Sequence, residues 1–258
     1  MKESLIILTF LFCCYTGLSQ NKNYQQKFTY KFSFKPYKNK ETVLKQEMIL
    51  LVGKNKSLFF SKQKTILDSL RKEYKNDVYA FIEITRKLPK NYINFIISKD
   101  FNKNQYIYQN KYMTDIYKYS EKIPILNWHL QKKYKTILGY SCQLATVTFR
   151  GRNYLAWFSK DIPIQDGPYK FIGLPGLILD IYDVEKVLHF TIIGIINANH
   201  IFPDIFNKKA FVIDKINESK FKLGVEKNII GRLIGPTALT VKKKLEDLKK
   251  YANHIELE

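Results

Sequence analysis

The chain has 258 residues, of which 45% are hydrophobic and 15% aromatic, enough to fill a core and to exclude a disordered protein. Its formal net charge is +20, but lysine supplies almost all of the excess, because arginine occurs only at positions 71, 86, 150, 152 and 232. Arginine is the side chain that binds phosphate bidentately. The charge therefore predicts a solvated lysine-rich surface, or attraction to an anionic envelope surface, and not nucleic-acid binding.

The first 19 residues have the pattern of a secretory signal peptide. Lys2 precedes a short apolar run, and the small residues Gly17 and Ser19 precede a polar stretch that starts at Gln20. We expect cleavage between Ser19 and Gln20, and a periplasmic, outer-membrane-associated or secreted protein whose residues 20–258 form a single domain. The apolar run is shorter than the roughly 20 residues that a membrane span needs.

Cys142 is the only cysteine that remains after cleavage, so no disulfide can form within the mature chain. A single cysteine in a strand is usually a small buried hydrophobe, and we expect this thiol to be unreactive.

Short segments of alternating polarity follow the signal. Residues 24–34 place Phe28, Tyr30, Phe32 and Phe34 on one face, which predicts a half-buried strand. A hairpin is expected over 42–60 and a helix over 61–74, with Ser61 as a possible N-cap. Further strands are expected at 78–85, 92–98, 105–109, 114–119, 125–131, 135–138, 143–149 and 154–159, and a hairpin joins 177–183 to 188–196. This spacing predicts a mainly β (α+β) fold with a few helices, in which an antiparallel sheet is curled or forms a half-barrel.

The last segment changes period. Apolar residues recur every three or four positions at Ala238, Val241, Leu245, Leu248, Ala252 and Ile255, which predicts a C-terminal amphipathic helix. Lysines cover its other face, so the helix could dock on the sheet or lie on a membrane. Its narrow apolar stripe lacks Trp and Phe, which favours docking on the sheet.

Residues 157–183 carry most of the functional information, because proline, glycine and large apolar residues alternate where a mere spacer would be polar. The segment could form the rim of a binding groove or a plug at the open end of a curled sheet. The candidate binding residues are Trp157, Asp161, Pro163, Gly167, Pro168, Tyr169, Phe171, Gly173, Leu174, Pro175 and Gly176.

Backbone preferences of proline and glycine predict the turn and the side-chain orientations of this segment. Pro175 and Gly176 fit a type II turn, in which Gly176 takes a positive φ. We expect Leu174 and Leu177 to point into the domain, Gly173 to allow a close backbone approach, and Tyr169 to lie at a wet edge.

Motifs for catalysis are largely absent. The histidines at 129, 189, 200 and 254 do not have metal-ligand spacing, and there is no HExxH, GxSxG or phosphate-loop motif, so no metal or cofactor is predicted. The acidic cluster at positions 161, 166, 180 and 183 could serve a hydrolase. However, Asp180 and Asp183 would lie on opposite strand faces, and Asp166 precedes Gly167 and Pro168 as a turn residue would.

The hexapeptide over residues 173–178 reads GLPGLI, and here the chain resembles the GLPGLI family of exported Bacteroidota proteins. The resemblance is specific over residues 127–183, and its lead-in includes Trp128, Cys142 and Trp157 with the segments 137–140, 149–152 and 161–164. It implies a cell-envelope protein of unknown activity, with no assigned catalytic residue or cofactor.

Three functional hypotheses follow. The first is an envelope protein that binds an apolar or peptide ligand, a lipid, or an outer-membrane protein through a groove on the concave sheet, gated by residues 161–176. The second is a secreted hydrolase that uses an aspartate of the 161–183 segment. The third is a basic adaptor for an anionic glycolipid.

Overall fold

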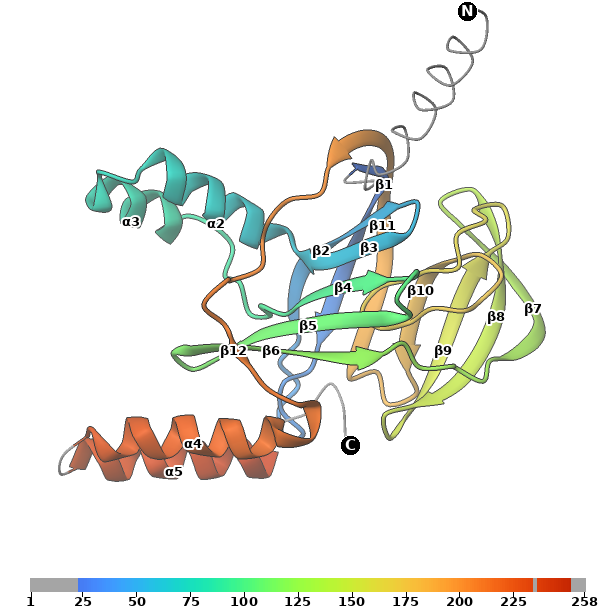
Figure 1. Ribbon diagram of the computed structural model, residues 1–258. Helices are drawn as coiled ribbons and strands as arrows, with labels where there is room; N and C mark the ends of the chain where they lie inside the picture. Colours follow the sequence, from blue (N-terminus) through green and yellow to red (C-terminus); the bar gives the residue numbers. More distant parts are fainter. Residues whose placement is uncertain (1–22, 234–235, 252–258) are drawn as a thin grey trace, which may run out of the picture.

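A computed structural model describes residues 23–233 and 236–251, which form an open, curled sheet of 12 strands with helices projecting from one end (Figure 1). The strands are β1 (Asn23–Phe34), β2 (Leu44–Gly53), β3 (Lys56–Ser61), β4 (Ile96–Asp100), β5 (Gln105–Tyr112), β6 (Asp115–Lys122), β7 (His129–Ile137), β8 (Tyr140–Phe149), β9 (Arg152–Ser159), β10 (Leu177–Asp183), β11 (Leu188–Ile201) and β12 (Phe211–Val212). The helices are α2 (Lys62–Glu73), α3 (Val78–Arg86), the 3-10 helix η1 (Lys215–Asn217), α4 (Glu218–Gly231) and α5 (Pro236–Tyr251). The expected signal peptide and its cleavage site lie outside the described residues.

The mainly β fold with a curled sheet is confirmed. The strand order is β12-β6-β5-β4-β3-β2-β1-β11-β10-β9-β8-β7, and adjacent strands run antiparallel except β12, which runs parallel to β6. Strand β1 joins the two halves of the sheet, because it pairs with β2 on one side and with the distant β11 on the other. The alternating face predicted for β1 is buried, as expected for Phe28, Tyr30 and Phe32.

Two apolar clusters lie on opposite faces of the sheet. The larger one fills the concave side, where the β1 aromatics meet the segment between β9 and β10. The smaller one lies behind β2, β3 and β4 and contains Leu51, Phe60 and Ile96. Residues after β11, among them Ile205, cover it. The strands of this half are therefore apolar on both faces, which explains their nearly continuous hydrophobic sequence.

Two-residue turns connect β7 to β8 and β8 to β9. Leu138 and Gly139 have φ of 49° and 85°, and Arg150 and Gly151 have φ of 48° and 72°. Two successive positive φ values are typical of type I′ turns, whose twist matches that of the paired strands. The hairpin predicted around Arg150 is therefore confirmed.

The prediction of a strand at 78–85 is wrong, because these residues form helix α3. Asp77 caps the helix by accepting a hydrogen bond from the Ala80 amide at 2.9 Å. β-Branched and aromatic residues favour strands only weakly, and the capped helix packs against α2. Helix α2 begins after Ser61 as predicted, but the Ser61 side chain does not bond to the helix amides.

The C-terminal helix exists but does not dock as expected. Helix α5 packs against α4, and α4 makes the contact with the sheet through the Phe221 ring, whose centre lies 5.3 Å from that of Tyr117. Leu245 is buried in this hairpin. Two residues of the predicted stripe, Ala252 and Ile255, lie outside the described residues. Among the described residues, no helix is long and apolar enough to cross a membrane.

Candidate functional site

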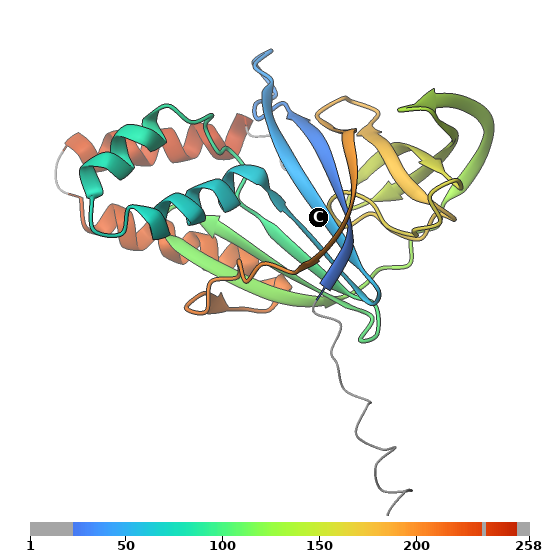
Figure 2. The same cartoon turned by 90° about the horizontal axis from the view of Figure 1, so that it is seen from above.

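Residues 161–176 form a plug that fills the concave side of the sheet. Seen from above, the segment lies inside the curl formed by β7–β11 (Figure 2). Gly167, Pro168, Phe171, Leu174 and Gly176 are buried. Asp161, Pro163, Gly173 and Pro175 are exposed at its outer surface, and Trp157 is half-buried on β9. The structure thus brings the candidate residues together in one segment.

Tyr169 does not lie at a wet edge, contrary to the prediction. Its side chain is 3% exposed and packs edge-on against Phe95, with ring centres 5.2 Å apart. Its backbone has a φ of 57°, a conformation that residues other than glycine seldom adopt. The amide of Phe171 donates to the Pro168 carbonyl at 3.2 Å, so Tyr169 occupies a tight turn that directs the following residues inward.

The two hexapeptide glycines have different roles. Gly176 has a positive φ as predicted, but the value is 157°, and its amide donates to the Leu174 carbonyl at 2.8 Å. An i to i+2 hydrogen bond defines a γ-turn, so the type II assignment is wrong. A Cβ at Gly176 would lie 2.0 Å from the Ser159 carbonyl oxygen. At Gly173 (φ 91°) it would meet only Trp128, at 3.9 Å, so Gly173 serves the backbone conformation and not a close approach.

A buried ion pair fixes the plug to β4. The Lys99 ammonium lies 2.5 Å from Oδ1 of Asp166 and also donates to the Gly167 carbonyl at 2.9 Å. Both charged side chains are 1% exposed. Burial lowers the pKa of Lys99, although Asp166 acts in the opposite direction. Asp166 is therefore more than the turn residue that the sequence predicts, because it anchors the plug.

A second buried lysine extends from the plug into a cage of aromatic rings. The Lys170 ammonium lies 5.0 Å from the ring centres of Tyr106 and Tyr108, and 5.4 Å from that of Tyr169. It also lies 3.7 Å from a carboxylate oxygen of Glu121. Ring faces and a carboxylate together offset the loss of water around this cation.

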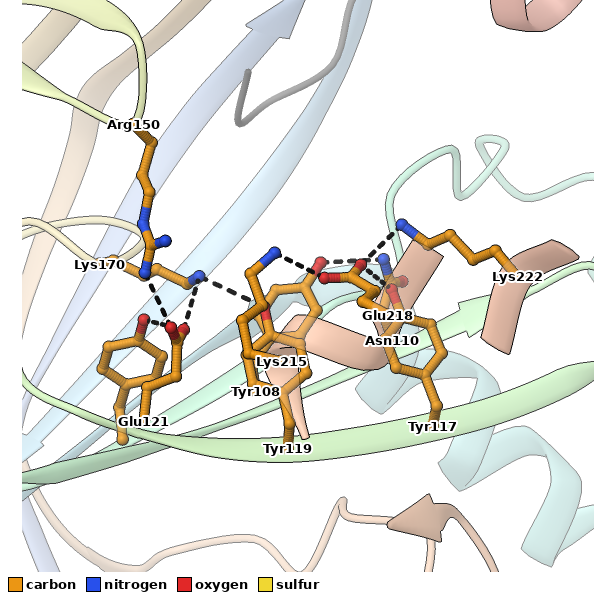
Figure 3. Close-up of polar contacts among 11 residues, drawn as sticks. Tyr108, Asn110, Tyr117, Tyr119, Glu121, Arg150, Lys170, Lys215, Glu218 and Lys222 are labelled. Atoms are coloured by element: carbon orange, nitrogen blue, oxygen red, sulfur yellow. Dashed lines mark hydrogen bonds and ion pairs between the residues drawn. The ribbon is translucent and has the colours of Figure 1, made fainter. Parts of the chain in front are cut away.

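The cage continues into the contacts that hold α4 (Figure 3). Arg150 donates to Glu121 at 2.8 Å, next to Lys170. On the other side, Glu218 accepts from Tyr117 at 2.6 Å and pairs with Lys215 at 2.7 Å. Burial alone would raise the pKa of Glu218, but Lys222, Lys215 and Tyr117 outweigh it and lower this pKa to about 2. The network joins the plug, strands β5 and β6, and α4.

The plug also binds the start of β10, next to β11. The Ile178 amide donates to the Asp166 carbonyl at 3.0 Å, and the Ile178 carbonyl accepts from the Tyr30 hydroxyl at 2.7 Å. These bonds occupy the backbone groups with which the start of β10 could have paired with β11. The pairing of β10 with β11 is therefore limited to residues 180–182 and 189–191.

Beyond Thr191, the side of β11 that faces away from β1 has no paired strand among the described residues. From Ile193 to Ile201, β1 is the only strand that pairs with β11 among the described residues. Ile193 and Ile196 are 45% and 54% exposed. Residues 187–203 contain no Lys, Arg, Asp or Glu, although the chain as a whole is strongly charged. This open edge is the second part of the candidate site.

Asp180, His189 and Thr191 lie together but do not have the geometry of a catalytic relay. Asp180 lies on the outer face, where it accepts from Lys135 at 2.8 Å and contacts Nε2 of His189 at 2.6 Å. The Thr191 hydroxyl approaches the same Nε2, at 2.9 Å. A nucleophile–base–acid relay needs both ring nitrogens, one for each partner. Because the hydroxyl and the carboxylate share one nitrogen, this geometry does not match the relay.

The remaining aspartates have structural partners. Asp183 is buried and pairs with Arg152 at 3.0 Å, while Asp161 accepts from the Ser141 amide at 3.2 Å. Asp180 and Asp183 lie on opposite faces, as predicted. Within residues 23–233 and 236–251, no group of acidic, His and Cys side chains has the arrangement of a metal site.

Sequence reasoning missed both lysine anchors and the open edge. Lysine is rarely buried, so nothing in the spacing singled out Lys99 or Lys170. The absence of charged residues over 187–203 is the sequence feature that could have indicated the open edge of β11.

The plug lies within the part of the chain that matches a known protein family. A family described as "Protein of unknown function (Porph_ging)" matches residues 150–180, which cover β9, the plug and the start of β10. No curated protein matches the chain.

Solved structures support the fold. Two structures of PNGF-II, in space groups P21 and C2, are similar to this chain with a TM-score of 0.53, at 14% and 15% identity. The match covers 78% of this chain and 33% of each PNGF-II chain, so this chain spans about a third of their length. A DUF1329 family protein from Desulfovibrio piger shares 10% identity over 72% of this chain and 88% of its own, with a TM-score of 0.24. At these identities the PNGF-II likeness shows the fold alone.

Proposed function

We propose that this chain is an exported envelope protein that binds an extended peptide segment of a partner protein as an added strand along the open edge of β11. The observation that carries the proposal is the uncharged stretch Ile193–Ile201, which has a β1 partner on one side only. An open strand edge presents backbone donors and acceptors in a row, and an extended peptide can satisfy them.

The other end of the sheet provides an internal contrast. Edge strand β7 carries Lys132, Lys133 and Lys135, and its pairing with β8 is irregular between Leu130 and Tyr134. Lysines and bulges are the features by which natural proteins prevent pairing at an edge. The β11 edge carries no lysine. Its pairing with β1 shifts near Ile193 and again beyond Asn197, but residues 194–197 keep a regular register.

The surface beside this edge fits an apolar or neutral peptide. Ile195 packs partly against the concave core, whereas Ile193 and Ile196 are exposed. A Cβ placed at Gly194 would meet only the Thr29 side chain, at 3.8 Å, so there is room above the strand at this position. Alternate side chains of an added strand would therefore contact apolar groups on both faces.

The plug has a supporting role in this proposal. It holds the start of β10 away from β11 through the Ile178 bonds, and its anchors Lys99 and Lys170 fix it in place. In this proposal residues 161–176 keep the neighbouring edge of β11 open, whereas the sequence predicts a gate over a groove. The hydrolase hypothesis lacks a comparable observation, because each candidate aspartate has a structural partner.

The test uses residues 20–258 and a set of ten-residue synthetic peptides that alternate apolar and uncharged polar residues, with binding followed by fluorescence anisotropy. We expect at least one peptide to bind, and Ile193→Lys with Ile196→Lys to weaken binding about tenfold or more, since an edge lysine opposes pairing. The matched control is Leu130→Lys on β7, which is similarly exposed and should leave binding unchanged. The proposal fails if no peptide binds, or if the control weakens binding as much as the β11 variant.

A further inference from the structure

Helix α3 is apolar and yet contributes no buried residue to the domain. It contains Val78, Tyr79, Phe81, Ile82 and Ile84, and none of them is buried. With α2 it forms a hairpin that projects from one end of the sheet, as the two views agree (Figures 1 and 2). The core of the domain therefore does not explain the apolar character of this helix.

The exposed apolar residues share one side of α3. Tyr79 is 87% exposed, Val78 63% and Ile82 39%. Residues 78 and 82 are one helical turn apart, so they are neighbours on the helix surface, and Tyr79 lies beside them. Phe81 and Ile84 are half-buried. Single exposed hydrophobes are ordinary, but a cluster on a projecting element indicates an interaction surface.

Exposed lysines precede and follow α3 in the chain. Lys72, Lys75, Lys87 and Lys90 are exposed, and none of them forms an ion pair with another described residue. These lysines therefore remain available to an anionic partner.

Most acidic groups of the hairpin are already engaged. Asp68 pairs with Lys64 and Arg71 at 2.9 and 3.2 Å, and Glu83 pairs with Arg86 at 2.9 Å. The Asp77 carboxylate caps α3. Glu73, the remaining acidic residue, lies beside Tyr74. The hairpin thus combines an exposed apolar face with more basic than acidic side chains.

We infer that the α2–α3 hairpin is an interfacial anchor that places Val78, Tyr79 and Ile82 at an anionic lipid surface. Amphipathic elements that lie at a bilayer surface combine apolar side chains that enter the headgroup region with lysines that contact anionic headgroups. Tyrosine suits this position because its ring is apolar and its hydroxyl remains hydrated. Three apolar residues bind weakly alone, so the lysines are needed as the second source of attraction.

This anchor is independent of the peptide-binding edge, because it lies on a different element and would act on a different partner. A protein held at an envelope surface by α2–α3 would keep β11 available to neighbouring proteins. Loss of either activity would leave the other in place, so the two proposals can fail separately.

The test is co-sedimentation of residues 20–258 with vesicles. One set contains phosphatidylcholine alone, and the other contains about one third phosphatidylglycerol. We expect binding to the anionic vesicles only. Val78→Ser with Tyr79→Ser should weaken binding about fivefold or more without changing the net charge, and Lys72→Gln with Lys75→Gln should weaken it similarly. Circular dichroism would confirm that these variants remain folded.

The matched control is Tyr134→Ser on β7, an exposed aromatic residue on the edge strand at the other end of the sheet order. It should bind anionic vesicles as the unmodified protein does. The inference is overturned if the unmodified protein does not bind anionic vesicles. It is also overturned if Val78→Ser with Tyr79→Ser leaves binding unchanged, since the attraction would then come from bulk charge, or if Tyr134→Ser weakens it equally.

Discussion

Replacing Gly176 by alanine tests the geometry at the end of the plug, because two separate costs can be worked from the structure. The first is conformational: a φ of 157° lies in a region that residues with a Cβ rarely enter, at a cost of about 1–3 kcal/mol. The second is steric. The new Cβ would lie 2.0 Å from the Ser159 carbonyl oxygen and 3.0 Å from the Lys160 amide nitrogen, and both are backbone atoms that cannot rotate away.

Relieving this clash requires a shift of β9 or of the plug, and such overpacking costs about 1–3 kcal/mol or more. The sum is about 2–6 kcal/mol, a large part of the stability of an ordinary domain. Gly139→Ala is the matched control: Gly139 has a φ of 85° with no atom within 4 Å of the added Cβ. It should cost only the conformational part, about 1–2 kcal/mol.

Urea unfolding of the two variants, followed by tryptophan fluorescence, measures this difference. We expect the midpoint of Gly176→Ala to fall well below that of Gly139→Ala at similar m-values. If both variants lose the same stability, the close approach of Gly176 to Ser159 does not exist in solution and the description of the plug is wrong.

Three further predictions concern buried groups. Lys99→Met should lower the free energy of unfolding in urea by about 3–5 kcal/mol, since it leaves Asp166 buried without its ion-pair partner. Adding Asp166→Asn should restore part of this stability. If it restores none, Lys99 and Asp166 do not pair in solution. Glu218 has a folded pKa of about 2 against an ordinary value of 4.5, so its contribution to the free energy of unfolding is fully present above pH 4.5 and is lost as pH falls toward 2. Unfolding at a series of pH values should show a loss of about 1–2 kcal/mol, discounted for screening by solvent. This pH dependence should disappear in Glu218→Gln. Burial raises the pKa of the Cys142 thiol to about 11, so a thiol reagent at pH 7.5 should label the folded protein far more slowly than the urea-unfolded chain, and equal rates would show that the thiol is accessible.

Local patterns predicted much of the sheet. The alternation in β1 and the hairpin at Arg150 both follow from side-chain period and turn chemistry, which need no information from distant residues. The positive φ of Gly176 was likewise predictable from the Pro-Gly pair, although the type of turn was not. The hydrogen bond from Leu177 to Ile162 competes with the bond that a type II turn would form.

Features that depend on distant contacts escaped prediction. Tyr169 was expected to be wet, but its burial depends on Phe95, a residue 74 positions earlier in the chain. Helix α3 was predicted as a strand because its residues favour strands, but this preference is weak, and the helix begins at the Asp77 cap and packs against α2. The open edge of β11 exists because Tyr30 and Asp166 bind the start of β10, a constraint that no local pattern contains.

Hydrogen exchange observed by NMR tests the peptide-binding proposal most directly. The amides of residues 193–201 would be compared with and without a saturating amount of the synthetic peptide that binds best. Strand addition predicts that amides on the open side of β11, which exchange quickly in the free protein, become protected, while the amides of β7 and of the plug do not change. Protection that appears in β7 or in residues 161–176, with none in β11, would contradict the account.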